Sequence, residues 1–304
     1  MKAAPGKAWS SRSLGSRFKH EFFYLTIRYA GRRTAGLFLW VVVFFYSLNP
    51  MVLRRSAPYL SRRFPNDSRW GRWHRAFQLN LSFGRVLLDR AIMGISGSMT
   101  FQAPAEEAAK LNQLLARGKG LLILSAHVGA WQTGMGWLAA DRKVYIVQRR
   151  DPEDVDRQYF EHQNAPGAKA LRPEFIDPEQ SGPALMATLS SALLGGHIVC
   201  LMGDRVLNNE PLKVRTSFLG GDIYLPAAPY FLAARLACPI AVVFTERCGP
   251  MTVKGRVYKV LEPKQALKSE AALRPWAGEF AEALEEYVHN KPYQFFNFYD
   301  LWNI

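Results

Sequence analysis

Short apolar runs and longer stretches of helical periodicity alternate along most of this chain. Four runs rich in apolar residues, at 121–124, 143–149, 198–202 and 240–245, are short enough to be buried strands. A fifth stretch, 252–261, alternates apolar and polar residues, and this pattern predicts an antiparallel edge strand.

Between these runs, apolar residues recur every three or four positions, which is the spacing of a helix with one buried face. The predicted helices are at 70–94, from about 131, at 183–194, at 229–237 and at 276–289. Strands that alternate with helices predict an α/β fold, with a mostly parallel central sheet flanked by helices.

Polar residues directly follow two of the predicted strands. His127 comes after the run at 121–124, and Asp204 and Arg205 come after the run at 198–202. Open α/β sheets place their ligands and chemistry at the carboxyl ends of the strands, so these side chains meet if the two strands are parallel neighbours. The structural alternatives are a core histidine at a tight turn and an ion pair that caps a strand.

The N-terminal quarter has a different character. The segment 36–48, GLFLWVVVFFYSL, is apolar throughout and has arginines on both sides. It is shorter than the roughly 20 residues of a spanning helix, and positive charge normally marks one side of a membrane only. We therefore expect a helix that dips into the cytoplasmic leaflet. A buried core helix and a single-span anchor are the alternatives.

Charge strengthens this division of the chain. The net charge is +14, and residues 1–75 hold 15 of the 39 basic residues but only two of the 25 acidic ones. Such a block favours an anionic partner, either a membrane surface or nucleic acid. The arginines flank a continuous apolar run and form no helix-turn-helix or zinc-finger spacing, so we expect anionic lipid and no nucleic acid. We expect residues 1–75 to anchor the chain and residues 76–304 to form the α/β domain.

The three cysteines, Cys200, Cys238 and Cys248, lack metal-ligand spacing, and two of them lie in or beside apolar runs. We expect reduced core thiols in a protein that faces the cytosol, and the N-terminus shows no apolar core of a secretory signal.

Several motifs, in order along the chain, resemble one family. The string HVGAWQ at 127–132 is similar to the H-x4-D/E box of the lysophospholipid acyltransferase superfamily, with Gln132 where that family usually has an acid. The pattern FG..L.D at 83–89, the GDR at 203–205 and the closing PYQFFNFYDLW at 292–302 resemble its bacterial branch, which contains the lipid A late acyltransferases and their predicted-acyltransferase relatives. The closing segment is similar to the predicted-acyltransferase relatives. From composition alone, this closing segment is either an aromatic plug over the core or a membrane-contact patch.

The resemblance implies roles for named residues. His127 is the expected base, and the residue at Gln132 normally orients it. A glutamine can accept a hydrogen bond from the ring but cannot offset the charge of an imidazolium, so Asp204 is a second candidate for this role. The expected substrate contacts are Arg149, Arg205, the backbone near Gly129, and the loop residues Phe218, Gly220 and Pro226.

The resemblance also implies an activity: transfer of a fatty acyl group from acyl-carrier protein or coenzyme A to a lipid or glycolipid acceptor, as in lipid A biosynthesis. Thioester chemistry of this kind needs no metal and no cofactor. The expected location is the cytoplasmic face of a bacterial inner membrane. Because Gln132 replaces the acid, a catalytically impaired lipid-binding protein remains an alternative, and an acyl hydrolase is another.

Overall fold

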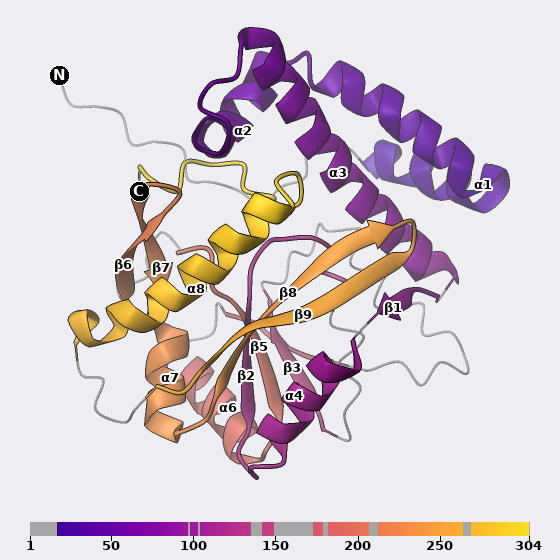
Figure 1. The fold of residues 1–304 in the computed structure, drawn as a ribbon. Coiled ribbons are helices and arrows are strands. Elements are labelled where there is room, and N and C mark those ends of the chain that lie inside the picture. The colour runs from indigo at the N-terminus through magenta and orange to yellow at the C-terminus, as the bar shows by residue number, and fades with distance from the viewer. Residues whose placement is uncertain are drawn as a thin grey trace.

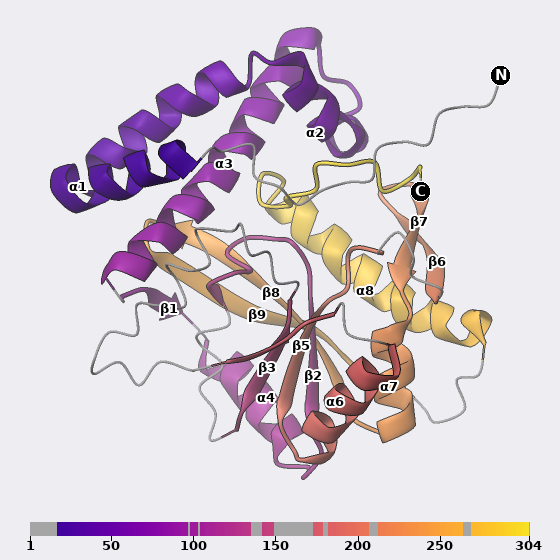
Figure 2. The same ribbon diagram turned by 180° about the vertical axis from the view of Figure 1, so that it is seen from behind.

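A twisted sheet lies at the centre of the computed structural model (Figures 1 and 2), which describes residues 17–96, 98–102, 104–134, 142–148, 173–178, 182–206, 212–263 and 269–303. Seven strands form this sheet in the described part of the chain, in the order β1-β9-β8-β2-β5-β3-β4. The strands are β1 (Thr100–Gln102), β2 (Leu121–Ser125), β3 (Val144–Val147), β4 (Glu174–Ile176), β5 (Ile198–Met202), β8 (Ile240–Gly249) and β9 (Thr252–Leu261).

The middle of the sheet is parallel, as predicted. Strand β2 pairs in parallel with β5 on one side and with β8 on the other, and β3 pairs in parallel with β5 and β4. Strand β9 runs antiparallel to β8, which confirms its predicted direction. The prediction that 252–261 is an edge strand is wrong, because the three-residue strand β1 pairs with its outer side.

Helices cover both faces of the sheet, and the side chains of β2 alternate between them. Leu121 and Ile123 pack with α4 (Ala105–Leu115), whereas Leu122 and Leu124 belong to the larger core on the other face. That face is covered by α6 (Gly182–Leu194), α7 (Ala228–Leu236) and α8 (Glu270–Asn290). Every residue of β2 is buried, as expected for a strand between two helical layers.

The N-terminal helices pack together beside the sheet (Figure 1). They are α1 (Arg17–Tyr46), which is broken at Gly31, α2 (Pro50–Arg63) and α3 (Arg69–Ser96). The apolar positions predicted on α3 face α1, and a Cβ added at Gly84 would lie 2.7 Å from Leu39 Cδ1. The predicted boundary after residue 75 falls inside α3, so one continuous helix joins the N-terminal quarter to the rest of the chain.

The closing segment, residues 291–303, passes over the carboxyl end of β2. Phe295 and Phe296 are buried, and Phe295 forms an isolated antiparallel bridge with Val128. Of the two interpretations of this segment, the structure favours the plug over the core.

Candidate active site

His127 lies just beyond the buried end of β2, and Asp204 lies just beyond the end of β5. Ser125 is the register partner of Met202, so each of the two side chains follows its strand by the same two positions. The Gly203 N–H donates to the Ser125 carbonyl at 2.7 Å and extends the pairing toward the site. The parallel register therefore brings the two residues together, as the sequence predicted.

The contact between them is a histidine–carboxylate pair. His127 Nδ1 lies 2.9 Å from Asp204 Oδ1 and 3.1 Å from Oδ2, and the His127 backbone N–H donates to Oδ2 at 3.2 Å. The carboxylate is 2% exposed and the histidine side chain is 21% exposed. The carboxylate is thus a buried support for a ring that remains accessible from one side.

The electrostatics of the pair fit an ionised carboxylate beside a neutral ring. Burial lowers the pKa of His127 below its ordinary value, and the Arg205 charge lowers it further, against the opposing influence of Asp204. Burial raises the pKa of Asp204, but the charge and hydrogen bonds of His127, together with Arg205, outweigh it and hold that pKa below its usual range. An ionised carboxylate only accepts, so the proton of the neutral ring belongs on Nδ1, and Nε2 is the basic nitrogen.

Arg205 is held beside this pair by the closing segment. Its Nη2 donates to the Phe296 carbonyl at 2.9 Å, its Nε lies 3.8 Å from Asp204 Oδ2, and its guanidinium lies over the Tyr299 ring. Arg205, which the sequence predicted at the site, therefore lies in a fixed position next to the Asp204 carboxylate.

Gln132 is not the group that contacts the His127 ring nitrogen. Asp204 makes that contact, and the buried Gln132 Oε1 has no hydrogen-bond partner among the described residues. The residues from Gly129 to Gly134 form turns, and the remainder of the helix expected from about residue 131 lies outside the described residues.

Gly129 allows this turn to pack closely against the backbone of β8. Its φ is +53°, and a Cβ there would lie 1.8 Å from the Thr245 carbonyl oxygen, so only glycine fits. Its N–H donates to the Gln294 carbonyl at 2.8 Å. This N–H is therefore already engaged within the protein and is not free to contact substrate, whereas the expected contact of the remaining backbone near Gly129 stays a prediction.

The predicted substrate loop forms a separate antiparallel hairpin, β6 (Lys213–Phe218) and β7 (Gly221–Pro226). Phe218 is fully buried and stacks on Trp302, so its ring is core and does not line an open site. Gly220 lies in the tight turn at φ +70°, and Pro226 ends β7. Arg149, the other predicted contact, lies outside the described residues.

Aromatic side chains that the sequence did not predict at the site surround His127. Trp131 lies 5.7 Å from the His127 ring and 5.4 Å from Phe296, between ring centroids, and Phe83 of α3 stacks on Trp131. Phe83 and Phe296 belong to motifs noted in the sequence, but nothing in the sequence showed that they meet at this ring. Among the described side chains, no group of three or more His, Cys, Asp and Glu is placed to hold a metal ion.

Together, the fold and the site define an α/β protein that carries a histidine–aspartate pair at the carboxyl edge of its parallel strands. Residues 89–303 match the model of the bacterial lipid A biosynthesis acyltransferase family. The match covers more than half of the chain, which therefore belongs to this family and is an acyltransferase.

One solved structure similar to this chain is the crystal structure of the 1-acyl-sn-glycerophosphate acyltransferase PlsC from Thermotoga maritima. The similarity has a TM-score of 0.37 at 10% sequence identity, and it covers 83% of this chain and 95% of that one. No curated protein matches the chain.

Proposed function

We propose that this acyltransferase moves a fatty acyl group from an acyl thioester to a hydroxyl or amine of a lipid or glycolipid acceptor, with His127 as the general base. The observation that carries the proposal is the contact of His127 Nδ1 with a buried, ionised Asp204. It leaves Nε2 as the nitrogen that takes a proton, on a side chain that is 21% exposed.

In the proposed reaction, Nε2 of neutral His127 takes the proton of the acceptor as its oxygen or nitrogen attacks the thioester carbonyl carbon. The new bond forms, the carbon–sulfur bond breaks, and the departing thiolate takes the proton back from the imidazolium. Asp204 keeps the ring in the productive tautomer and stabilises the imidazolium, so Gln132 is not required for either task.

Negative charge builds on the thioester oxygen during the attack, and a fixed positive group beside it lowers the barrier. Arg205 is our candidate for this group, because it is positioned by the Phe296 carbonyl and lies beside the His127–Asp204 pair. The donor is acyl-carrier protein or coenzyme A, and an acceptor of the lipid A type agrees with the family description.

The test of this function is product analysis. The purified enzyme is incubated with labelled acyl-carrier thioester or acyl-coenzyme A and bacterial membranes, and we expect the label in a lipid product. Label that appears only as free fatty acid would make the protein a hydrolase. Mass spectrometry of lipids from cells with and without the gene then identifies the acceptor.

We further propose that the N-terminal helices hold the enzyme at the cytoplasmic face of the bacterial inner membrane. None of the described helices is by itself long and apolar enough to cross a membrane, although α1 and α2 together, bent by 92°, meet that measure of length and composition. The second part of α1 packs Ala35 and Leu39 against α3 and leaves Leu37 and Phe45 about two-thirds exposed.

An apolar helix face flanked by arginines binds at an anionic lipid surface. The proposed lipid contact consists of Leu37, Phe38, Trp40, Val41 and Phe45, with Arg28, Arg32, Arg33, Arg54 and Arg55 exposed around it.

Vesicle sedimentation tests the attachment. Leu37→Asp with Phe45→Asp should weaken binding to anionic vesicles at least tenfold, because burying one such side chain is worth about 1.5–3 kcal/mol. The matched control is Leu194→Asp on α6, which is also exposed but lies outside this face. Equal binding by the double variant and the control would rule out this lipid contact.

A further inference from the structure

The loop that carries His127 is not held by the sheet, because β2 ends at Ser125. Besides the hydrogen bond from the His127 N–H to Asp204, two backbone hydrogen bonds attach this loop to the closing segment. The Phe296 N–H donates to the His127 carbonyl at 2.9 Å, and the Gly129 N–H donates to the Gln294 carbonyl at 2.8 Å. Residues 294–296 therefore hold the His127 carbonyl and the Gly129 N–H, while Asp204 holds the His127 N–H.

The side chain of Gln294 in turn fastens these residues to β8. Its Oε1 accepts the Arg247 N–H at 2.8 Å, and its Nε2 donates to the Arg247 carbonyl at 3.1 Å. One side-chain amide thus forms hydrogen bonds with both the N–H and the carbonyl of a strand residue, as the backbone of a neighbouring strand would. Strand β2 pairs with β8 only as far as Val242, so Gln294 supplies pairing to a part of β8 that β2 does not reach.

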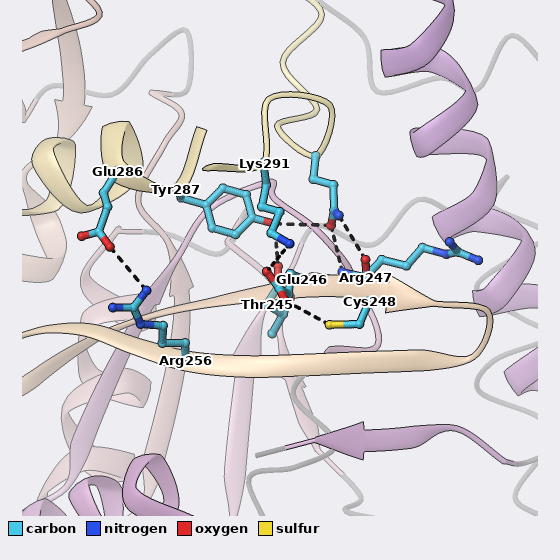
Figure 3. Close-up of polar contacts among 9 residues, drawn as sticks. Thr245, Glu246, Arg247, Cys248, Arg256, Glu286, Tyr287 and Lys291 are labelled. Atoms are coloured by element: carbon cyan, nitrogen blue, oxygen red, sulfur yellow. Dashed lines mark hydrogen bonds and ion pairs between the residues drawn. The ribbon is translucent and has the colours of Figure 1, made fainter. Parts of the chain in front are cut away.

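A buried tyrosine completes this attachment. The Tyr287 hydroxyl lies 3.0 Å from the Thr245 carbonyl and 3.4 Å from Gln294 Oε1, and Figure 3 shows Tyr287 directed from α8 toward β8 at Thr245. The same Thr245 carbonyl is the atom that a Cβ at Gly129 would strike. Helix α8, strand β8 and the His127 turn therefore meet at Gln294.

From this geometry we infer that Gln294 is a positioning residue for His127. Its side chain attaches the closing segment to β8 at Arg247, and its backbone carbonyl holds the turn that orients the imidazole. The inference rests on the proposed role of His127 as base. Gln294 touches neither the ring nor Asp204, so it acts only through the backbone of the turn.

Two substitutions separate the hydrogen bonds from the volume of this side chain. Gln294→Met keeps nearly the same length and loses every side-chain hydrogen bond. Gln294→Glu keeps the bonds that Oε1 accepts and loses the one that Nε2 donates. Tyr293→Phe is the matched control in the same closing segment. It removes the hydrogen bond that Arg75 Nη1 donates to the Tyr293 hydroxyl at 2.5 Å, which is not one of the contacts that hold the His127 turn.

Misplacing a catalytic group by about 1 Å can cost roughly 100-fold in rate. We expect Gln294→Met to lower kcat about 10- to 100-fold with KM within about threefold, and Gln294→Glu to fall between it and the natural enzyme. Tyr293→Phe should keep the natural kcat. All rates are divided by the folded fraction, measured by circular dichroism at the assay temperature.

A merely structural residue would not move the pH profile, whereas a positioning residue should. The ionisable groups that act on His127 are Asp204 and Arg205, and Gln294→Met leaves both in place. Burial is what lowers the pKa of His127, so a loosened turn that admits water raises it toward its ordinary value. The acid limb of kcat/KM should therefore move to higher pH in Gln294→Met.

The outcomes distinguish this inference from the proposed function. A fully active His127→Ala enzyme would overturn the function itself. If His127→Ala is inactive but Gln294→Met keeps the natural kcat per folded molecule and the natural acid limb, only the positioning role is overturned. A kcat loss in Gln294→Met with an unchanged pH profile, matched by Tyr293→Phe, would also overturn it.

Discussion

Replacing Asp204 by asparagine removes the charge beneath His127 while keeping the shape of the side chain. Asparagine can donate to Nδ1, and this favours the tautomer with its proton on Nε2, which cannot accept a proton from the acceptor. In a hydrolase triad, the equivalent change costs about 10⁴ in rate. Here Arg205, 3.8 Å from the carboxylate, already offsets part of its charge. We therefore expect a loss of about 10³, or about 4 kcal/mol at 1.36 kcal/mol per tenfold.

The assay follows the free thiol released from the acyl donor in the presence of membranes, from about pH 5 to 9, across the ordinary His titration near 6.5. The Asp204 charge raises the pKa of His127 against the effect of burial, so its removal should move the acid limb of kcat/KM to lower pH. If the rate of Asp204→Asn stays within about fivefold of the natural rate, Asp204 does not support a general base, because general-base catalysis contributes at least roughly 10²-fold.

Three further outcomes follow from the same geometry. Gln132→Glu should not raise the rate, because Asp204 already contacts the ring; a large increase in kcat would contradict this. The acid limb of the natural enzyme should have its midpoint below about pH 6.5, since burial lowers the pKa of His127, and a pH profile of kcat/KM checks it. Gly129→Ala should lose roughly 4 kcal/mol or more to its backbone clash, whereas Gly118→Ala, with a similar φ in open space, should lose only about 1 kcal/mol; thermal melting compares them.

Periodicity predicted the parallel core of this fold because β2 and β5 are buried on both faces, and such strands appear in the sequence as unbroken apolar runs. Strand β1 was not predicted, because three residues are too few to show the alternation of apolar and polar positions that marks a strand. Helix α8 begins at Glu270, six residues before the predicted start, because the Ser269 side chain caps it and Pro275 lies inside the first turns.

The candidate site was predictable where it depends on strand ends, and unpredictable where it depends on long-range contacts. The proximity of His127 and Asp204 follows from parallel register, and it is confirmed. The choice between Gln132 and Asp204 could not be made from the sequence, because it depends on which way each side chain points. The hydrogen bond between Gln294 and Gly129 joins residues more than a hundred positions apart, so no local sequence pattern predicts it.

His127→Gln tests most directly whether His127 Nε2 removes the proton of the acceptor. Glutamine can donate to Asp204 and fills much the same space, but it has no basic nitrogen. Transfer of labelled acyl groups to membrane lipid, per folded enzyme, should fall by roughly 10²- to 10⁴-fold, the range of general-base catalysis. If the His127→Gln enzyme keeps its transfer rate within about tenfold of the natural rate, which is a smaller loss than the removal of a general base causes, then His127 is not the base.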